Sequence, residues 1–288
     1  MRIVVGLAGL TLAMAGVPGA IIAAEVAAPP QTMAPPPRTI AYGSGALQQI
    51  DYYAPPRGAE APPLLLFVHG GGWRIGDKKM VAQKPAWAQA QGLAFASVGY
   101  GLLPDTPLEG QARDVAAAVK LLRAQAGRLG FDPDRIILMG HSAGAHLVAL
   151  VATDPAYFGR DLSAVKAVIP LDGAGYDVPR QMAAGRFLTR RIYGPAFGTD
   201  VARQKQLSPV HHGALPNAPR WLIVHSSERA DSGEQSRLLA NTLRKAGATV
   251  AVQPVALTHR EINVRLGTPG YPAQAAIDSL IAEVKLPK

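Results

Sequence analysis

Residues 136–144 read Ile-Ile-Leu-Met-Gly-His-Ser-Ala-Gly, and a helix-forming stretch continues from Ala143 to Val151. The apolar run predicts a strand and the segment after it predicts a helix, so the chain turns sharply between them. Small residues two positions before and two positions after Ser142 are what such a turn requires on steric grounds. The stretch therefore predicts a strand-turn-helix with the Ser142 hydroxyl at its apex.

Strands and helices alternate on both sides of this stretch. An opening hairpin is expected at 39–42 and 48–53, and helical patterns lie at 108–129, 233–245 and 272–284. Continuous apolar runs, typical of strands buried on both faces of a parallel sheet, occupy 64–68, 94–98, 135–139, 165–170, 221–225 and 249–255. The order predicts an α/β domain with three layers and a doubly wound, mostly parallel sheet.

The N-terminal segment has the layout of a signal peptide. A single cation at Arg2 precedes an apolar run over 3–15 that is too short to favour a membrane span, and small residues follow. We predict a signal peptide at 1–24, a proline-rich linker at 25–38 and one domain at 39–288, with an insert at about 173–219 over the active site. The mature protein is therefore expected in the periplasm or secreted by a bacterium.

Composition narrows the function classes. The chain has 288 residues, no cysteine and a formal charge of +9, and its cations are scattered without an aromatic-basic motif, which argues against nucleic-acid binding. The glycines after position 69 match neither phosphate-binding fingerprint, and no histidine-carboxylate cluster has metal-ligand spacing. We expect no cofactor, no metal and no integral membrane association after signal removal, and the sequence leaves the oligomeric state open.

Three features besides the strand-turn-helix at Ser142, hereafter the elbow, carry a family resemblance. Phe-Val-His-Gly-Gly-Gly-Trp stands at 67–73, upstream of Ser142, a carboxylate loop follows the strand at 221–225, and His259 lies after the last strand. In this order the chain resembles the α/β-hydrolase family, in its lipase and esterase branch with the His-Gly-Gly-Gly signature. The resemblance runs from about Arg38 to the C-terminus and extends to carboxylesterases, feruloyl esterase-like proteins and aryl formamidases.

The resemblance implies a role for each motif. Ser142 is the expected nucleophile and His259 the base that takes its proton and later protonates the leaving group. The backbone N–H groups of Gly71, Gly72 and Ala143 are expected to hold the oxyanion. Trp73 either walls the substrate pocket or packs under the glycine loop.

Two carboxylates compete for the role of the acid. The loop Ser226-Ser227-Glu228-Arg229-Ala230-Asp231-Ser232 offers two carboxylates. We favour Asp231, with Glu228 as the alternative acid. Asp172, which follows the strand at 165–170, is interpreted as a structural carboxylate.

Together these features predict an exported serine esterase that hydrolyses small carboxylic esters through an acyl-enzyme. Short-chain acyl or aryl esters are the expected substrates, feruloyl and acetyl groups among them. Two alternatives stay open: an aryl formamidase-type amide hydrolase, and a catalytically silent hydrolase-fold binding protein.

Overall fold

The computed structural model describes residues 35–58, 61–184, 187–215 and 217–286. The predicted signal peptide at 1–24 and most of the linker at 25–38 lie outside these residues. Within the described ranges, the helices are all too short or too polar to cross a membrane.

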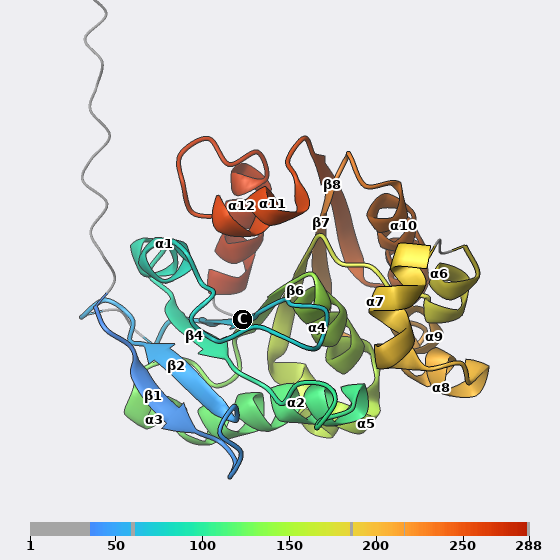
Figure 1. Cartoon of the computed structure of the whole chain (residues 1–288). Coiled ribbons are helices and arrows are strands. Elements are labelled where there is room, and N and C mark those ends of the chain that lie inside the picture. Colours follow the sequence, from blue (N-terminus) through green and yellow to red (C-terminus); the bar gives the residue numbers. More distant parts are fainter. Residues whose placement is uncertain (1–34, 59–60, 185–186, 216, 287–288) are drawn as a thin grey trace, which may run out of the picture. The chain divides into compact units, whose positions relative to one another are not determined.

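An eight-stranded sheet organises the described domain (Figure 1). Its strands follow the order β1-β2-β4-β3-β5-β6-β7-β8; β1 and β2 pair antiparallel, as do β2 and β4, and every later pairing is parallel. The fold class predicted from the sequence is confirmed. The strands are β1 Arg38–Ala41, β2 Gln49–Tyr53, β3 Leu64–Val68, β4 Ala94–Val98, β5 Ile136–His141, β6 Val165–Leu171, β7 Arg220–Ser226 and β8 Thr249–Val255.

Helices cover both faces of the sheet. They are α1 Lys84–Ala90, α2 Leu108–Ala124, α3 Ala126–Leu129, α4 Ala143–Thr153, α5 Pro155–Phe158, α6 Val178–Ala184, α7 Phe187–Phe197, α8 Val201–Gln206, α9 Pro209–His212, α10 Ala230–Lys245, α11 His259–Val264 and α12 Gln274–Lys285, with a 3₁₀ turn at Gly159–Ala164.

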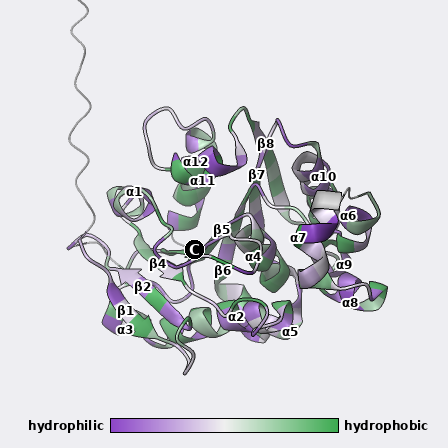
Figure 2. Ribbon diagram, in the orientation of Figure 1, coloured by the Kyte–Doolittle hydropathy of each residue, from purple (hydrophilic) through white to green (hydrophobic). Residues whose placement is uncertain are grey.

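Alternate side chains of the central strands β3 to β7 enter two separate cores. On β3, Leu64, Leu66 and Val68 pack with α2, α4 and α10, whereas Leu65 and Phe67 pack with α1, α11 and α12. A strand buried on both faces must be apolar at every position, which explains the continuous runs in the sequence. The edge strand β8 is mostly exposed or half-buried, so the expectation that residues 249–255 form a strand buried on both faces is wrong. Figure 2 shows hydrophobic colouring along the central strands and α4 and hydrophilic colouring on parts of α7.

Besides shifts of one or two residues at other element ends, the structure differs from the sequence expectation at three places. The helix expected at 108–129 is interrupted at Gln125, so that α3 is separate from α2. The insert after β6 is largely helical and holds α6 to α9. Helix α10 begins at Ala230 rather than near Gly233, which puts Asp231 in a helical first turn instead of a loop.

Candidate active site

The turn between β5 and α4 places Ser142 at the carboxyl edge of the sheet. Ser142 has φ +56°, in the left-handed region that L-residues rarely adopt. A Cβ on Gly140 would lie 2.3 Å from the Gly144 carbonyl oxygen, and a Cβ on Gly144 would lie 2.1 Å from that of Val68. Both distances are far inside van der Waals contact, so the two glycines are needed to bring this sharp turn against β3.

The glycine loop after β3 lies directly beside this turn. A Cβ on Gly70 would come within 2.9 Å of the Ser142 Cβ, and one on Gly71 within 1.8 Å of the Ile75 carbonyl oxygen. Gly71 and Gly72 also have positive φ values, +124° and +58°. The loop therefore approaches the serine with bare backbone.

This arrangement leaves backbone donors near the hydroxyl. Among the hydrogen bonds of the described residues, none uses the N–H of Gly71, Gly72 or Ala143. Ala143 is the first residue of α4, where a helix leaves its N–H groups without internal partners. All three residues line cavities that also contain Ser142. The residues predicted to hold an oxyanion are thus gathered around the serine with unused donors.

His259 is fixed by the start of α11. Thr258 caps this helix through a reciprocal capping box with Glu261, so His259 is the first helical residue. The backbone carbonyl of His259 accepts a hydrogen bond from His141 Nε2 at 2.9 Å. Burial lowers the pKa of His141 to about 3, which keeps that imidazole neutral.

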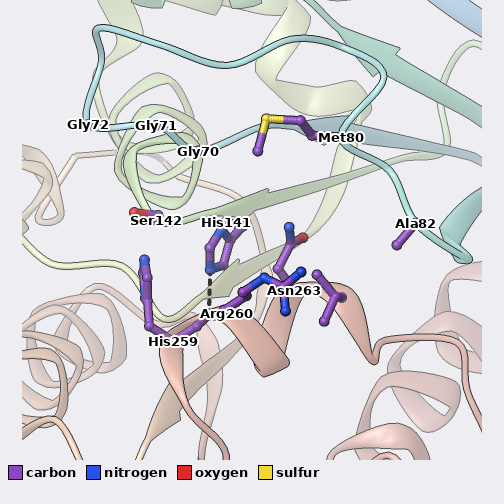
Figure 3. Close-up of a pocket in the computed structure, with 11 residues that line it drawn as sticks. Gly70, Gly71, Gly72, Met80, Ala82, His141, Ser142, His259, Arg260 and Asn263 are labelled. Atoms are coloured by element: carbon purple, nitrogen blue, oxygen red, sulfur yellow. Dashed lines mark hydrogen bonds between the residues drawn. The ribbon is translucent and has the colours of Figure 1, made fainter.

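The His259 imidazole points toward Ser142 (Figure 3). Both residues line the same two cavities. The hydrogen bonds of the described residues do not include one between the two side chains. Such catalytic contacts are often long in unliganded hydrolases and tighten when substrate binds.

Asp172, and not Asp231, holds the other side of the imidazole. Its Oδ2 lies 2.5 Å from His259 Nδ1, although the two residues are 87 positions apart in the chain. The Asp172 side chain is fully buried, whereas that of His259 is 41% exposed. The interpretation of Asp172 as a purely structural carboxylate is therefore corrected by its contact with the predicted base.

Asp172 is held as a carboxylate. Burial raises its pKa, but hydrogen bonding to His259, the charge of Arg229 and a bond from the Ser226 N–H outweigh burial and bring the pKa well below its usual value. The Ser226 N–H donates to Oδ1 at 3.0 Å and the Arg229 guanidinium to Oδ2 at 2.8 Å. Because Nδ1 of His259 faces an ionised acceptor, it carries the proton and leaves Nε2 free as a base.

Arg229 also lies 2.9 Å from Nδ1 of His259. A guanidinium only donates, so it forms no hydrogen bond with a protonated Nδ1, and its bond here is to Asp172. Its other terminal nitrogen donates to Asp231 Oδ2 at 3.0 Å. Arg229 thus separates Asp231 from the histidine.

The predicted acid and its alternative do not reach His259. Among the described residues, Asp231 bonds to Arg229 and, at 3.4 Å, to Gln181, and its side chain is 43% exposed. Glu228 is also exposed, and no hydrogen bond links its side chain to His259 in the described part of the chain. The expectation that either residue orients the histidine does not agree with this geometry, since α10 begins early and directs Asp231 toward Arg229.

Two cavities meet at Ser142. The larger has a volume of about 550 Å³ and lies between the glycine loop and α11 (Figure 3); its lining includes Met80, Ala82 and Val264. The smaller, of about 250 Å³, lies on the side of the insert and is lined in part by Ala174, Ile192 and Tyr193. Two separate spaces therefore open on the two sides of Ser142.

Of the two roles open to Trp73 from the sequence, the structure shows the first, a place in the cavity wall. Its packing is against α4 and the insert rather than under the glycine loop. Its ring lines the smaller cavity and makes edge contacts with His146, Tyr193 and Phe197 at centroid distances of 4.9 to 5.4 Å. Only 2% of the residue is exposed. Trp73 is therefore both a wall of the cavity and a packed residue under the insert.

Known proteins match this chain over most of the domain. The model of the BD-FAE family matches residues 50–243. The esterase LipC of Mycobacterium tuberculosis is 30% identical over 72% of this chain and 55% of its own, and the kynurenine formamidase of Salmo salar is 26% identical over 64% and 55%. The chain spans about half the length of the curated relatives it matches.

A solved structure agrees with the fold. Thermogutta terrifontis esterase 2, determined after phosphonylation by sarin, superposes with a TM-score of 0.70 at 20% identity and covers 88% of this chain and 94% of its own. That identity speaks for the fold alone. With the family match over residues 50–243, the glycine loop and the serine elbow, the chain belongs to the BD-FAE family of the α/β-hydrolase fold.

Proposed function

We propose that this protein is a serine esterase that hydrolyses small carboxylic esters through an acyl-enzyme. Ser142 is the nucleophile and His259 the general base. Asp172, in place of Asp231, orients His259. The contact that carries the proposal is the 2.5 Å approach of the buried Asp172 carboxylate to His259 Nδ1, because it leaves Nε2 unprotonated on the side that faces Ser142.

The reaction follows from these positions. The Ser142 oxygen attacks the ester carbonyl carbon while its proton passes to His259 Nε2, and the N–H groups of Gly71, Gly72 and Ala143 stabilise the resulting oxyanion. The tetrahedral intermediate then expels the alcohol, whose oxygen takes the proton from Nε2. Water repeats the sequence on the acyl-enzyme and releases the carboxylic acid.

Cavity size supports small substrates. Pockets that bind small molecules usually have volumes of roughly 300 to 1,000 Å³. The two cavities, about 550 and 250 Å³, fit a short acyl chain on one side and an aryl or small alkyl group on the other. The relatives with esterase names point to the same chemistry.

The direct test is covalent labelling with a fluorophosphonate, followed by turnover of 4-nitrophenyl acetate. We expect labelling and turnover in the native protein and loss of both in Ser142→Ala. Absence of labelling in the folded native protein would favour a silent binding protein. A higher kcat/KM for N-formylkynurenine than for 4-nitrophenyl acetate and methyl ferulate would instead assign amide hydrolysis, as the formamidase relative suggests.

We also propose that the enzyme is exported. The support is the leader-like sequence at 1–24, with its single cation and its short apolar run. N-terminal sequencing of protein from a periplasmic or culture fraction is expected to begin after Ala24 or Ala28. An intact Met1 on protein found only in the cytoplasm would refute export without affecting the catalytic proposal.

A further inference from the structure

The larger cavity has a strongly donor-rich wall on α11. Arg260 is the only arginine or lysine among its lining residues, and none of them is an aspartate or a glutamate. Arg260 and Asn263 line it from α11, opposite Met80 and the glycine loop (Figure 3).

The Arg260 guanidinium is available to bind a ligand. Its side chain is exposed, and the ion pairs and hydrogen bonds of the described residues include none with it. The neighbouring carboxylate, Glu261, bonds to Thr258 in the capping box and lies 3.9 Å from Arg265. A guanidinium has its donors fixed in a fork that matches a carboxylate, so Arg260 is available to bind one.

Asn263 adds a second donor, and a hydrogen bond from Lys84 fixes the orientation of its amide. Its Oδ1 accepts a hydrogen bond of 2.7 Å from Lys84 Nζ, which in its ammonium form only donates. The amide oxygen is therefore turned to Lys84, and the Nδ2 hydrogens are turned away from it. Because Asn263 is 8% exposed and lines the cavity, these hydrogens are offered to whatever occupies that end.

Lys84 lies behind the wall and adds a positive charge there when it is protonated. It is fully buried, and its Nζ donates at 2.6 Å to the Asn263 carbonyl and lies 4.7 Å from the centroid of the Phe67 ring. No carboxylate pairs with it among the described residues. Burial lowers its pKa to about 7, so a negative charge nearby would favour its protonated form.

We propose that this end of the larger cavity binds a carboxylate of the substrate, with Arg260 and the Asn263 amide as its donors. The inference rests on the proposed esterase function, since the same cavity contains Ser142. It narrows the substrate class to esters that carry a free carboxylate apart from the ester group, such as half-esters of dicarboxylic acids and acylated hydroxybenzoates.

Two matched substrate pairs test the proposal. 4-Nitrophenyl hydrogen adipate and 4-nitrophenyl hexanoate differ by a carboxylate at the end of the acyl chain. 4-Acetoxybenzoate and its methyl ester differ by a carboxylate on the leaving group. Rates with hydroxide alone correct for intrinsic reactivity. We expect the native enzyme to prefer the charged member of at least one pair in kcat/KM by about tenfold or more, the effect of one charge-assisted hydrogen bond.

Variants separate binding of the carboxylate from general charge effects. Arg260→Gln is expected to remove most of that preference, mainly through a higher KM for the charged ester. Asn263→Asp keeps an acceptor for Lys84 but presents a negative charge, and is expected to reverse the preference. Arg237→Gln on α10 removes one positive charge from an exposed residue away from both cavities and is expected to leave the ratio unchanged.

The outcomes distinguish this proposal from the esterase assignment. Equal corrected kcat/KM for both members of both pairs, or equal losses for charged and neutral esters in Arg260→Gln, would overturn the carboxylate site while esterase activity stands. No hydrolysis of any of the four esters by folded native enzyme would refute the esterase assignment itself.

Discussion

Replacing Asp172 with asparagine tests the assignment of the acid. The substitution keeps the size of the side chain and an oxygen able to accept from the Ser226 N–H, now 3.0 Å from Oδ1. It puts an amide N–H where Oδ2 lies 2.5 Å from His259 Nδ1. A donor at that place favours the tautomer of His259 with an unprotonated Nδ1, and the proton then resides on Nε2, where it prevents proton transfer from Ser142.

The expected loss is large because this contact is short and fully buried. Amidation of the triad aspartate in a serine protease lowers kcat by about 10⁴, through the wrong tautomer of the histidine. The same fault is expected here, with kcat lower by about 10⁴, or roughly 5.5 kcal/mol in the activation free energy. The new N–H also faces the Arg229 guanidinium, now 2.8 Å from Oδ2, which adds a clash of two donors.

The assay is steady-state hydrolysis of 4-nitrophenyl acetate by native enzyme, Asp172→Asn and the matched variants Asp231→Asn and Glu228→Gln. Circular dichroism and the thermal midpoint establish that each variant is folded. We expect losses below about tenfold for the two exposed carboxylates, since solvent screens them. A loss in Asp231→Asn or Glu228→Gln that equals that of a folded Asp172→Asn would refute the reasoning.

Two further outcomes concern the scaffold. Gly144→Ala puts a Cβ 2.1 Å from the Val68 carbonyl oxygen and is expected to lower the free energy of unfolding, measured in urea, by about 1 to 3 kcal/mol or more. The control Gly127→Ala has no atom within 4 Å of its Cβ and is expected to cause no loss of stability. Equal stabilities of the two variants would contradict the steric argument. Between its lowered pKa of about 7 and its ordinary pKa of 10.5, Lys84 binds fewer protons in the folded protein than in the unfolded chain. The free energy of unfolding is therefore expected to rise with pH over that window, by an amount on the order of 5 kcal/mol from this group, and the rise should be missing in Lys84→Met. Parallel profiles of the two proteins, measured by denaturation between pH 7 and 10, would contradict this expectation.

The fold was predictable from the sequence because its local signals agree. The central strands β3 to β7 are buried on both faces, as their continuous apolar runs indicate, and β3 and β4 begin and end where these runs do. The run at 249–255 predicts the bounds of β8 but not its burial, because β8 lies at the edge of the sheet and is mostly exposed or half-buried. The elbow was predictable because a Cβ at Gly140 or Gly144 would collide with a backbone carbonyl oxygen, so any sequence with this turn needs small residues at the two positions. Boundaries shifted where tertiary contacts decide them, as at the early start of α10.

The acid was not predictable for a physical reason. Asp172, Glu228 and Asp231 all follow strands that end at the same edge of the sheet, so their order in the chain does not select among them. The choice depends on how Asp172 turns after β6, with φ +45°, and on Arg229, which lies between Asp231 and the histidine. A sequence signal for the position of the base was available in the Thr258–Glu261 capping box, which fixes His259 as the first residue of a helix.

Asp231 has a use in this arrangement even though it does not contact His259. The Arg229 cation lies 2.8 Å from Asp172 and 2.9 Å from His259, so by itself it would cancel the charge of Asp172 and oppose an imidazolium. Asp231, which accepts a hydrogen bond from the other terminal nitrogen of Arg229, adds a second negative charge to the cluster of Asp172, Arg229 and Asp231. The three residues then carry a net charge of −1, and protonation of His259 during catalysis brings the cluster to neutrality. Because the two acids differ in burial, 0% against 43% exposed, removing Asp172 is expected to stop proton transfer, whereas removing Asp231 only makes the imidazolium less stable.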